Sequence, residues 1–334
     1  MWVSGGAGFV GRALVRALVE RGDDVVAAVR DARRATFLTD LGATVVQDDL
    51  SDVRRLTEAL RDVDAAIHAA GSYRIGISRA ERGAMWDANI GTTTRVLDAA
   101  EAAGTERIVY VSTANVFGNT HGQVVDEGYR RDLSEGFVSW YDQTKYGAHE
   151  VAVQRIAGGA PIVIVQPGQV YGPGDHSEVG ERLDLAYRGR LRYVALADLG
   201  LALVHLDDLA AGIVAALDRG VVGQSYILAG PTIRMGEAEA LAARLGGHEL
   251  PRLRLPTELL RLAQPFGRLI GQPNLAEVIS ASAGVTYWAS SAKAEAELGF
   301  KARSIEDGFR DTFMSAPSSA SGSAASGSAD SGSV

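Results

Sequence analysis

Apolar runs and helical patterns alternate over the first half of the chain. Short runs rich in Val, Ile and Ala predict buried strands at 24–29, 43–50, 64–71, 107–113 and 161–168. Segments with apolar residues at i, i+3 and i+4 predict amphipathic helices at 11–22, 52–62, 89–104 and 143–159. This alternation is typical of an α/β protein with a doubly wound parallel sheet and right-handed crossovers.

The alternation weakens after Pro167. A glycine- and proline-rich stretch at 172–176 predicts a loop, and amphipathic patterns predict helices at 205–220 and 237–247. A smaller mixed α/β lobe is therefore expected beyond this point, with some of its strands returning to the main sheet.

Composition narrows the function classes. A net charge of −8 disfavours nucleic-acid binding, which needs a basic face. No apolar run reaches the roughly 18 residues that cross a membrane, and no signal-peptide pattern opens the chain. The absence of cysteine excludes disulfides, thiolate metal sites and cysteine nucleophiles. The expectation is a cytoplasmic enzyme or binding protein with neither nucleic-acid nor membrane partners.

A glycine-rich turn lies near the N-terminus. Gly5, Gly8 and Gly11 follow a short apolar stretch and lead directly into the first predicted helix. Backbone N–H groups and the helix dipole at such a junction favour a pyrophosphate. We expect Gly5 to allow the tight turn, Gly8 to let the backbone approach the phosphates, and Gly11 to let the helix pack on the sheet. The turn alone is a weak signal in a chain with 39 glycines.

Only the segment Met1–Ser4 precedes this turn, which is short for the central strand that such a turn normally follows. Two interpretations are open: the first strand is unusually short, or the native start lies several residues upstream. In the second case a longer apolar strand should raise thermal stability, and no change would count against truncation.

The end of the second predicted strand bears on cofactor choice. NAD sites place an acidic residue there for the ribose 2′-hydroxyl, whereas NADP sites have an arginine near the 2′-phosphate. Arg30 stands at the strand end, with Arg33 and Arg34 beyond it, while Asp31 falls where its side chain points elsewhere. The pattern favours NADP over NAD, and a solvated basic helix start is the alternative.

Tyr141 and Lys145 stand four residues apart in a predicted helix and so share a face. A phenol has a pKa of about 10, and a nearby ammonium can bring it toward the working range of an acid or base. Of 33 basic residues only Lys145, Lys293 and Lys301 are lysine, and arginine does not replace lysine at a compact titrating site. The pair predicts proton transfer, and a surface lysine beside a half-buried tyrosine is the alternative.

Ser112 and Thr113 end the strand predicted at 107–113, and Thr113 lies 28 residues before Tyr141. Open α/β sheets bind their ligands at the carboxyl ends of the strands. A hydroxyl at that edge would hold a substrate oxygen while Tyr141 exchanges its proton.

Together these motifs resemble those of the extended short-chain dehydrogenases/reductases, the NAD-dependent epimerase/dehydratase family, from Val3 to about Phe313. The matching segments are SGGAGFVG (4–11), DDLSD (48–52), IHAAG (67–71), NIGTTTRVLDAA (89–100), STANVFG (112–118), YDQTK (141–145) and QPGQVYGPGD (166–175). With the Arg30 argument, the resemblance implies an NADP site, or an NAD site, formed by Gly5, Gly8, Phe9, Val10, Gly11, Arg30, Asp49, Leu50, Ala69, Ala70, Gly71, Asn89, Tyr141, Lys145, Pro167, Gly168 and Val170. It makes Thr113, Tyr141 and Lys145 the catalytic residues.

The pattern and the resemblance predict one architecture: α/β, with a Rossmann-type doubly wound parallel sheet and a smaller mixed α/β substrate lobe. The dinucleotide-binding Rossmann domain is expected over 1–168 and the substrate-binding lobe over 169–314. The stretch 315–334 is small, polar and without periodicity, which predicts a disordered tail.

Within the family, AVRD (28–31), AGSYRIG (70–76) and LALVHLDDLAAG (201–212) resemble the dihydroflavonol-reductase-like branch. Nucleotide-sugar members typically carry an arginine just before the Val-His-Val-Asp-Asp segment and another before the proline of the last motif. Here Leu201-Ala202-Leu203 and Gln166 take those places, which weighs against a nucleotide-diphosphate substrate. The expected substrate contacts are Ser72, Tyr73, Thr113, Phe117, Tyr171 and His176.

Two histidines have structural interpretations. His205 with Asp207 and Asp208 has the composition of a metal site, but a helix cap is expected there, with Asp207 or Asp208 opening the helix, and no metal is expected. His68 lies in a buried-strand pattern and is expected to serve packing.

Three function classes stay open. The first is an NADP-dependent oxidoreductase that reduces a ketone or aldehyde, or runs in reverse on an alcohol, with a homodimer through the helices of Asn89 and Tyr141 as this family often forms. The second is a sugar or nucleotide-sugar epimerase or dehydratase with tightly bound NAD. The third is a non-catalytic dinucleotide-sensing protein, whose class tends to lose the Tyr-Lys pair retained here.

Overall fold

The computed structural model describes residues 1–262 and 274–314, so the predicted tail at 315–334 lies outside the described residues. Within these residues, the main sheet has seven strands in the order β10-β6-β5-β4-β1-β2-β3. All adjacent pairs in this sheet are parallel. The strands are β1 (Trp2–Ser4), β2 (Val26–Val29), β3 (Thr44–Gln47), β4 (Ala66–His68), β5 (Ile108–Val111), β6 (Ile162–Pro167) and β10 (Ser225–Leu228). The predicted Rossmann-type parallel sheet is confirmed, with one further strand at its edge.

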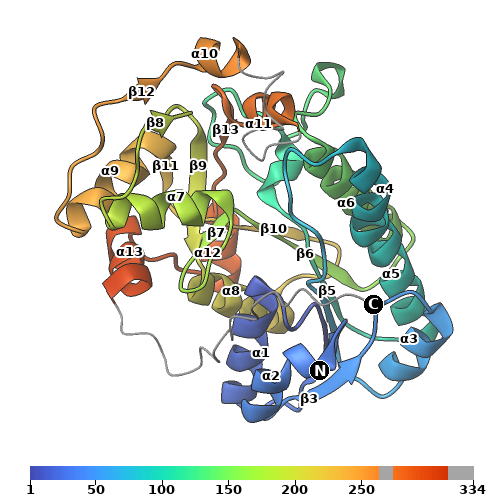
Figure 1. The fold of residues 1–334 in the computed structure, drawn as a ribbon. Coiled ribbons are helices and arrows are strands. Elements are labelled where there is room, and N and C mark those ends of the chain that lie inside the picture. The colour runs from blue at the N-terminus through green and yellow to red at the C-terminus, as the bar shows by residue number, and fades with distance from the viewer. Residues whose placement is uncertain (263–273, 315–334) are drawn as a thin grey trace, which may run out of the picture.

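Helices cover both faces of this sheet (Figure 1). One layer contains α1 (Phe9–Arg21), α2 (Thr36–Asp40), α8 (Leu206–Arg219) and α12 (Ala292–Leu298), and the other contains α3 (Val53–Leu60), α5 (Thr92–Ala103) and α6 (Trp140–Ala157). Alternate strand residues serve the two layers. Val3 packs in one core with Leu14 of α1, whereas Trp2 packs in the other core with Leu97 of α5.

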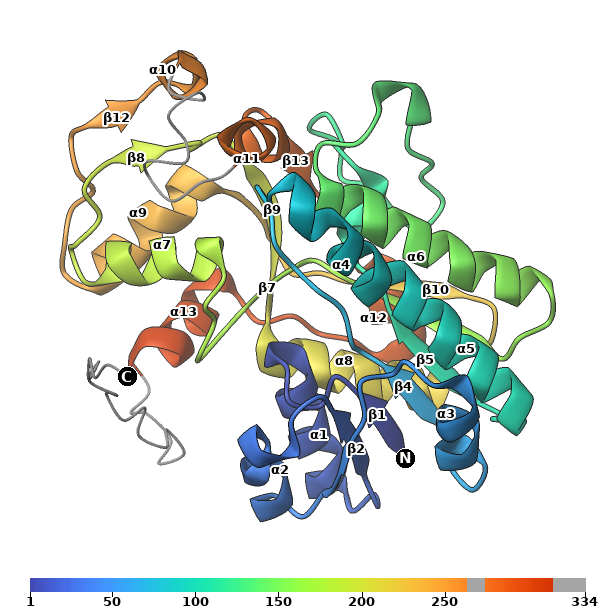
Figure 2. The ribbon, with the colours of Figure 1, turned by 45° about the vertical axis from the view of Figure 1, so that its right-hand side comes forward.

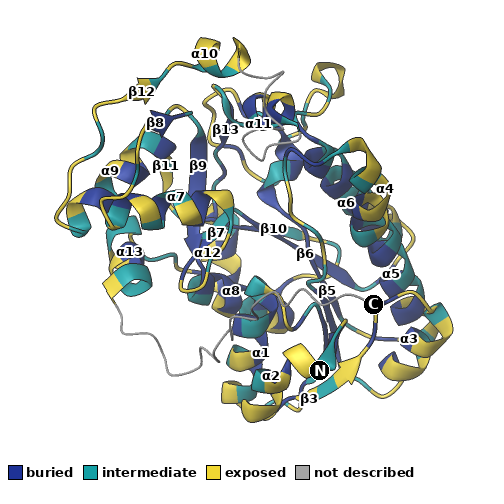
Figure 3. Cartoon of the chain, in the orientation of Figure 1, coloured by how far each residue is buried: buried dark blue, intermediate teal, exposed yellow. Residues whose placement is uncertain are grey.

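The burial of the central strands on both faces explains why the apolar runs predicted them, whereas the edge strand β3 is largely exposed. Every residue of β5 and β6 is buried, and Figure 3 shows exposed residues mainly on the outer sides of the helices. The five predicted strands all form, although each is shorter than its run of apolar residues. The helix predicted at 89–104 begins with a π-helical segment, Asp87–Gly91, that continues into α5.

Strand β1 has three residues and lies inside the sheet, next to the middle strand β4, where it is paired on both edges. In register, Trp2 is opposite Val26 of β2 and Ala66 of β4. The glycine-rich turn therefore leaves the sheet from one of its interior strands.

The second lobe follows β6 and lies over one end of the main sheet, at the upper left in Figure 2. Its strands are β7 (Gln169–Tyr171), β8 (Val194–Ala195), β9 (Gly200–His205), β11 (Thr232–Arg234), β12 (Arg254–Leu255) and β13 (Thr286–Tyr287). Its helices are α7 (Glu178–Tyr187), α9 (Met235–Leu245), α10 (Thr257–Leu262), α11 (Leu275–Ser282) and α13 (Ile305–Met314). One further helix, α4 (Arg82–Trp86), lies outside the lobe and precedes α5 in the chain. Strand β9 pairs with β7 and β13 in parallel and with β11 antiparallel, so the lobe is mixed.

The two parts exchange segments. Helix α8 and strand β10 come from beyond residue 168, yet β10 extends the main sheet beside β6 and α8 packs on α1. The lobe is thus joined to the sheet at several points rather than by one linker. In the described part of the chain, no helix has the length and apolar character needed to cross a bilayer.

Candidate active site

A cleft of about 750 Å³ lies along the carboxyl ends of the central strands. Its walls are the turn after β1, the loop after β4, the ends of β5 and β6, one side of α6, and residues 174–178 of the lobe. Of the residues expected from the sequence to bind cofactor or to act in catalysis, the cleft is lined by Gly5, Gly8, Phe9, Val10, Gly11, Ala69, Ala70, Gly71, Thr113, Tyr141, Lys145, Pro167, Gly168 and Val170. The fold therefore brings five separate sequence motifs to one place.

The glycine-rich turn is shaped by backbone contacts. Gly5 has φ +71°, and a Cβ there would lie 2.8 Å from the backbone nitrogen of Ala70. Gly8 is the N-cap of α1 and provides no side-chain cap, so the first N–H groups of the helix stay open to the cleft. A Cβ on Gly11 would lie 2.0 Å from the Gly5 carbonyl oxygen. The expectation for Gly11 needs correction, because its closest constraint is the turn itself rather than the sheet.

Ser4 ties the turn to the loop after β4. Its Oγ accepts hydrogen bonds from the backbone nitrogens of Ala69 and Ala70, each at 3.2 Å, and donates to Nδ1 of His68 at 2.7 Å. The Nε2–H of His68 then donates to Oγ1 of Thr93 at 3.1 Å. Burial lowers the pKa of His68 to about 3, so this ring is neutral and structural, as its buried pattern predicted.

Tyr141 and Thr113 meet in the cleft. Both are buried, and burial raises the pKa of the Tyr141 phenol above its ordinary value, although a hydrogen bond with Thr113 opposes the shift. The net shift of the Tyr141 pKa is therefore upward, against the predicted lowering beside Lys145. The reason is that loss of hydration penalises the phenolate more than the neighbouring groups stabilise it.

Lys145 lies one helical turn after Tyr141 on α6. Its Nζ donates to the backbone carbonyl of Val111 at 3.4 Å and lies 5.6 Å from the ring centroid of Tyr110. Burial lowers the pKa of Lys145 to about 8. The side chain is therefore mostly an ammonium at neutral pH, held at the cleft floor rather than at the surface.

Replacing Lys145 by methionine should remove a pH dependence of stability. The ammonium titrates at a pKa of about 8 in the folded protein against 10.5 for the ordinary group. The unfolded chain thus binds more protons between these values, so the free energy of unfolding of the wild-type protein rises as pH rises above 8. Denaturant unfolding at pH 7, 8, 9 and 10 should show this rise relative to Lys145→Met, a comparison in which tyrosine titration cancels. Parallel profiles for the two proteins would contradict a buried ammonium.

Asn89 is buried beside the cleft and does not line it. Its Oδ1 accepts from the backbone nitrogen of Ser72 at 2.7 Å, and its Nδ2 donates to the Ser72 carbonyl at 3.1 Å. The same Nδ2 donates to Oγ1 of Thr144 at 2.9 Å. Asn89 therefore holds the loop after β4 against α6. It affects the cleft indirectly, by positioning Ser72, which lines it.

The expected substrate contacts divide into two groups. Ser72, Tyr73 and His176 line the cleft, as does Thr113. Phe117 and Tyr171 lie in packed cores instead, which corrects the expectation for both. Phe117 follows β5 on a short helical turn, and Tyr171 packs its ring against His205 and Phe309.

Three residues that were expected to bind the cofactor lie outside the cleft. Arg30, Asp49 and Leu50 follow β2 and β3 and do not line the cleft. Arg30 is exposed and makes no hydrogen bond or ion pair with another described residue, whereas Leu50 is buried with φ +62°. The nearby Asp48 is buried, and its carboxylate accepts from the backbone nitrogen of Leu50 at 2.7 Å. The buried carboxylate of Asp48 therefore fixes the backbone of the DDLSD segment.

Sequence reasoning missed several residues that build the site. Arg12 lines the cleft, and its guanidinium donates to the Gly174 carbonyl at 3.1 Å. Its place directly after Gly11 could have identified it. Glu277 of α11 accepts from the backbone nitrogen of Trp140 at 2.6 Å, at the start of α6. Nothing in the sequence pattern pairs these two segments, which lie 137 residues apart.

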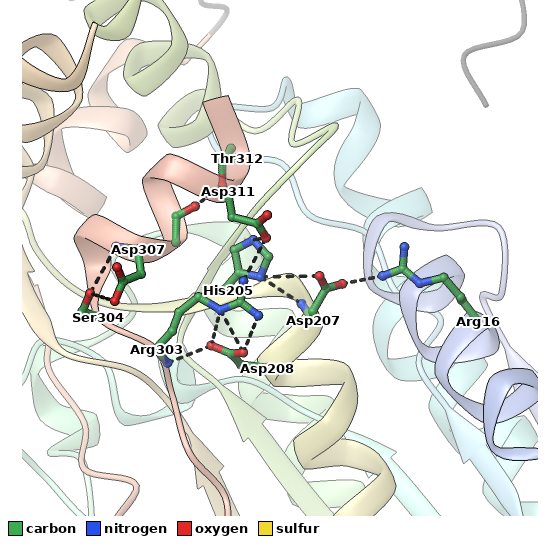
Figure 4. Close-up of polar contacts among 10 residues, drawn as sticks. Arg16, His205, Asp207, Asp208, Arg303, Ser304, Asp307, Asp311 and Thr312 are labelled. Carbon is green, nitrogen blue, oxygen red and sulfur yellow. Dashed lines mark hydrogen bonds and ion pairs between the residues drawn. The ribbon is translucent and has the colours of Figure 1, made fainter. Parts of the chain in front are cut away.

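His205, Asp207 and Asp311 form the cluster in Figure 4 whose side-chain ligand atoms lie within 4.8 Å of one another. Both carboxylates have cationic partners: Asp207 pairs with Arg16 at 2.5 Å, and Asp311 pairs with Arg303 at 2.9 Å. The first pair connects α1 with α8, and the second connects the segment before α13 with α13 itself, so ion pairs account for both carboxylates without a metal ion. The expectation of no metal here stays a prediction.

The cap of α8 is His205 itself. Its buried Nδ1 accepts from the backbone nitrogen of Asp207. Asp207 and Asp208 lie in the first helical turn, and Asp208 pairs with Arg303 at 2.7 Å. The predicted helix cap is confirmed, but the prediction that Asp207 or Asp208 supplies it is wrong, because the extended backbone of His205 is the position from which a side chain reaches the first free N–H.

The strand order, the glycine-rich turn and the Tyr-Lys pair in one cleft are those of an extended short-chain dehydrogenase/reductase. The chain belongs to the NAD dependent epimerase/dehydratase family, whose sequence model matches residues 1–229. The resemblance read from the motifs is thereby confirmed.

Similar proteins cover nearly the whole chain. It is 31% identical over 323 residues to a putative dihydroflavonol 4-reductase of Synechocystis sp., covering 93% of this chain and 92% of that protein. It is 28% identical over 331 residues to the 2-alkyl-3-oxoalkanoate reductase of Stenotrophomonas maltophilia, covering 92% and 96%. The crystal structure of gox2253 matches with a TM-score of 0.80 at 29% identity, covering 94% of this chain and 96% of that chain.

Proposed function

We propose that this protein is an NADPH-dependent reductase of a ketone or aldehyde that also runs in reverse on the alcohol. The observation that carries the proposal is that Thr113, Tyr141 and Lys145 line the same cleft as the glycine-rich turn. The names of two similar proteins, both reductases, support this direction.

The residues of the cleft fit a nicotinamide dinucleotide. The open N-terminus of α1 at Gly8 and the guanidinium of Arg12 would hold the pyrophosphate. The loop Ala69–Gly71 and the segment after β6 would line the remainder, and Lys145 would hold the nicotinamide ribose. When bound, the dinucleotide supplies the hydride.

The chain's own residues move the proton. Because burial keeps Tyr141 protonated at neutral pH, its O–H is suited to donate a proton to the substrate oxygen in the reducing direction. The hydroxyl of Thr113 orients that oxygen, and the ammonium of Lys145 stabilises the phenolate that remains on Tyr141. The role of Tyr141 as proton donor thus depends on a raised pKa of its phenol, whereas a role as base would need a lowered pKa.

Arg30→Ala is expected to weaken NADPH binding by about tenfold and to leave NADH binding nearly unchanged. A tenfold loss is what one charge-assisted contact to a 2′-phosphate contributes at an exposed position. The measurement is the dissociation constant of each nucleotide by fluorescence titration. Arg33→Ala is the matched control, since Arg33 is exposed and pairs with Asp31. Tighter binding of NADH than NADPH by the wild-type protein would defeat the Arg30 argument.

The function is tested by NADPH and NADH binding followed by a panel of ketones and aldehydes. Net consumption of NADPH with one of these substrates is the expected result. Purified protein that retains cofactor without consuming added NADPH would favour an epimerase or dehydratase instead. Nucleotide binding with neither behaviour would favour a sensing protein. A cytoplasmic location and a homodimer through α5 and α6 stay predictions.

A further inference from the structure

A second cavity, of about 100 Å³, lies beside the cleft and reaches into the lobe. Both are lined by Tyr73, Ile75, Asn115, Gly168, Gln169 and Glu178, so the two are adjacent. The volume is somewhat below that of the roughly 150 Å³ cavity known to accept benzene. It is therefore large enough for a short alkyl limb and too small for a nucleotide. We call it the side cavity.

The junction of the two cavities lies beside the proposed reacting groups. The ring of Tyr73 packs edge-on against Tyr141, with centroids 4.8 Å apart. Oδ1 of Asn115 accepts from Oγ1 of Thr113 at 3.4 Å. A substrate whose oxygen is bound by Thr113 and Tyr141 would thus have one substituent directed past Tyr73 and Asn115 into the side cavity.

Most of the lining that the side cavity does not share with the cleft is apolar, with Ser282, Arg182 and Tyr287 as the residues that carry polar groups, and the apolar residues come mainly from four elements of the lobe. They include Val179 of α7, Leu199 and Leu201 at β9, Met235 of α9, and Val278 of α11. Tyr287 also lines it, but its hydroxyl donates to the Ala281 carbonyl at 3.0 Å, so its polar atom is already bound. Such walls favour hydrocarbon and leave a buried polar group without partners.

The charged residues around the side cavity also favour an uncharged substituent. Among the described residues that line the side cavity, Glu178 and Arg182 are the charged ones. Arg182 donates to the fully buried Glu239 at 2.7 Å, which compensates its charge within the protein. A diphosphate would meet one carboxylate and one guanidinium that is already paired. The free-energy cost of desolvating the diphosphate would then not be compensated by a new ion pair.

We infer that the side cavity is a specificity pocket for the uncharged alkyl limb of a ketone substrate. The inference rests on the proposed function for the carbonyl end of the substrate. It adds the class of substrate, a ketone with an uncharged alkyl chain. The nucleotide half of a nucleotide sugar is excluded from this pocket by both size and charge.

The test is a series of methyl ketones with NADPH: 2-butanone, 2-hexanone and 2-octanone. We expect kcat/KM to rise by about fourfold for each methylene that enters the cavity, the usual gain for a buried CH₂. Val278→Phe, which adds a ring at the apolar wall, should lower kcat/KM for 2-octanone by about tenfold and leave 2-butanone within about twofold. Ala276→Phe is the matched control, since Ala276 is exposed on the same helix.

A second measurement separates this inference from the proposed function. Calorimetric titration of the Tyr141→Phe protein with 2-octanone measures binding without turnover. Binding that Val278→Phe abolishes and Ala276→Phe preserves supports the pocket, even if no ketone is reduced and the proposed function fails. Equal kcat/KM across the series, an equal effect of Val278→Phe on long and short ketones, or binding of UDP-glucose that Val278→Phe abolishes and Ala276→Phe preserves overturns it.

Discussion

Tyr141→Phe is expected to lower kcat for ketone reduction by about 10²- to 10⁴-fold, the usual contribution of a positioned proton donor. The change deletes the buried phenol oxygen and leaves the ring that packs on Tyr73 in place. NADPH binding should therefore stay within about twofold of the wild-type protein. Stopped-flow turnover and fluorescence titration on the same preparation measure the two quantities.

Tyr146→Phe is the matched control for this prediction, because it removes the same oxygen from the same helix at a half-buried position outside the cleft. Its kcat should be close to that of the wild-type protein. Normal turnover by Tyr141→Phe would sink the mechanism, and equal losses in both variants would assign the effect to the helix rather than to the proton donor.

Gly11→Ala is expected to weaken binding of NADPH and NADH alike by about a hundredfold. The added methyl would lie 2.0 Å from the Gly5 carbonyl oxygen, so the turn must move away from the helix. Two charge-assisted hydrogen bonds from its backbone would then be lost, which accounts for the expected factor. Overpacking should also lower the free energy of unfolding by about 1–3 kcal/mol.

Gly83→Ala serves as the control for the glycine turn. Gly83 lies in α4, and a Cβ there would have no neighbouring atom within 4 Å. Nucleotide titration and thermal unfolding of the two variants give the comparison. Wild-type affinity in Gly11→Ala would mean that the turn yields without loss of its phosphate contacts, and the proposed role of the open helix end would be wrong.

Local patterns in the sequence determined the sheet, its helices and the residue types at the cleft. Each central strand is buried on both faces, so it appears as an unbroken apolar run. Tyr141 and Lys145 share a helix face because their spacing is one helical turn. The glycine spacing predicted a strand–turn–helix junction, and φ +71° at Gly5 agrees with it. Information of this kind is contained in a few neighbouring residues.

Only the tertiary structure decided how the remaining groups are used. Whether Tyr171 faces a substrate or a core depends on Phe309, far along the chain, and the raised pKa of Tyr141 depends on how much water the assembled cleft excludes. Glu277 supports the start of α6, and Val278 beside it lines the side cavity. These are contacts and desolvation between distant segments, and no local pattern encodes them, because burial belongs to the packed molecule rather than to any stretch of its sequence.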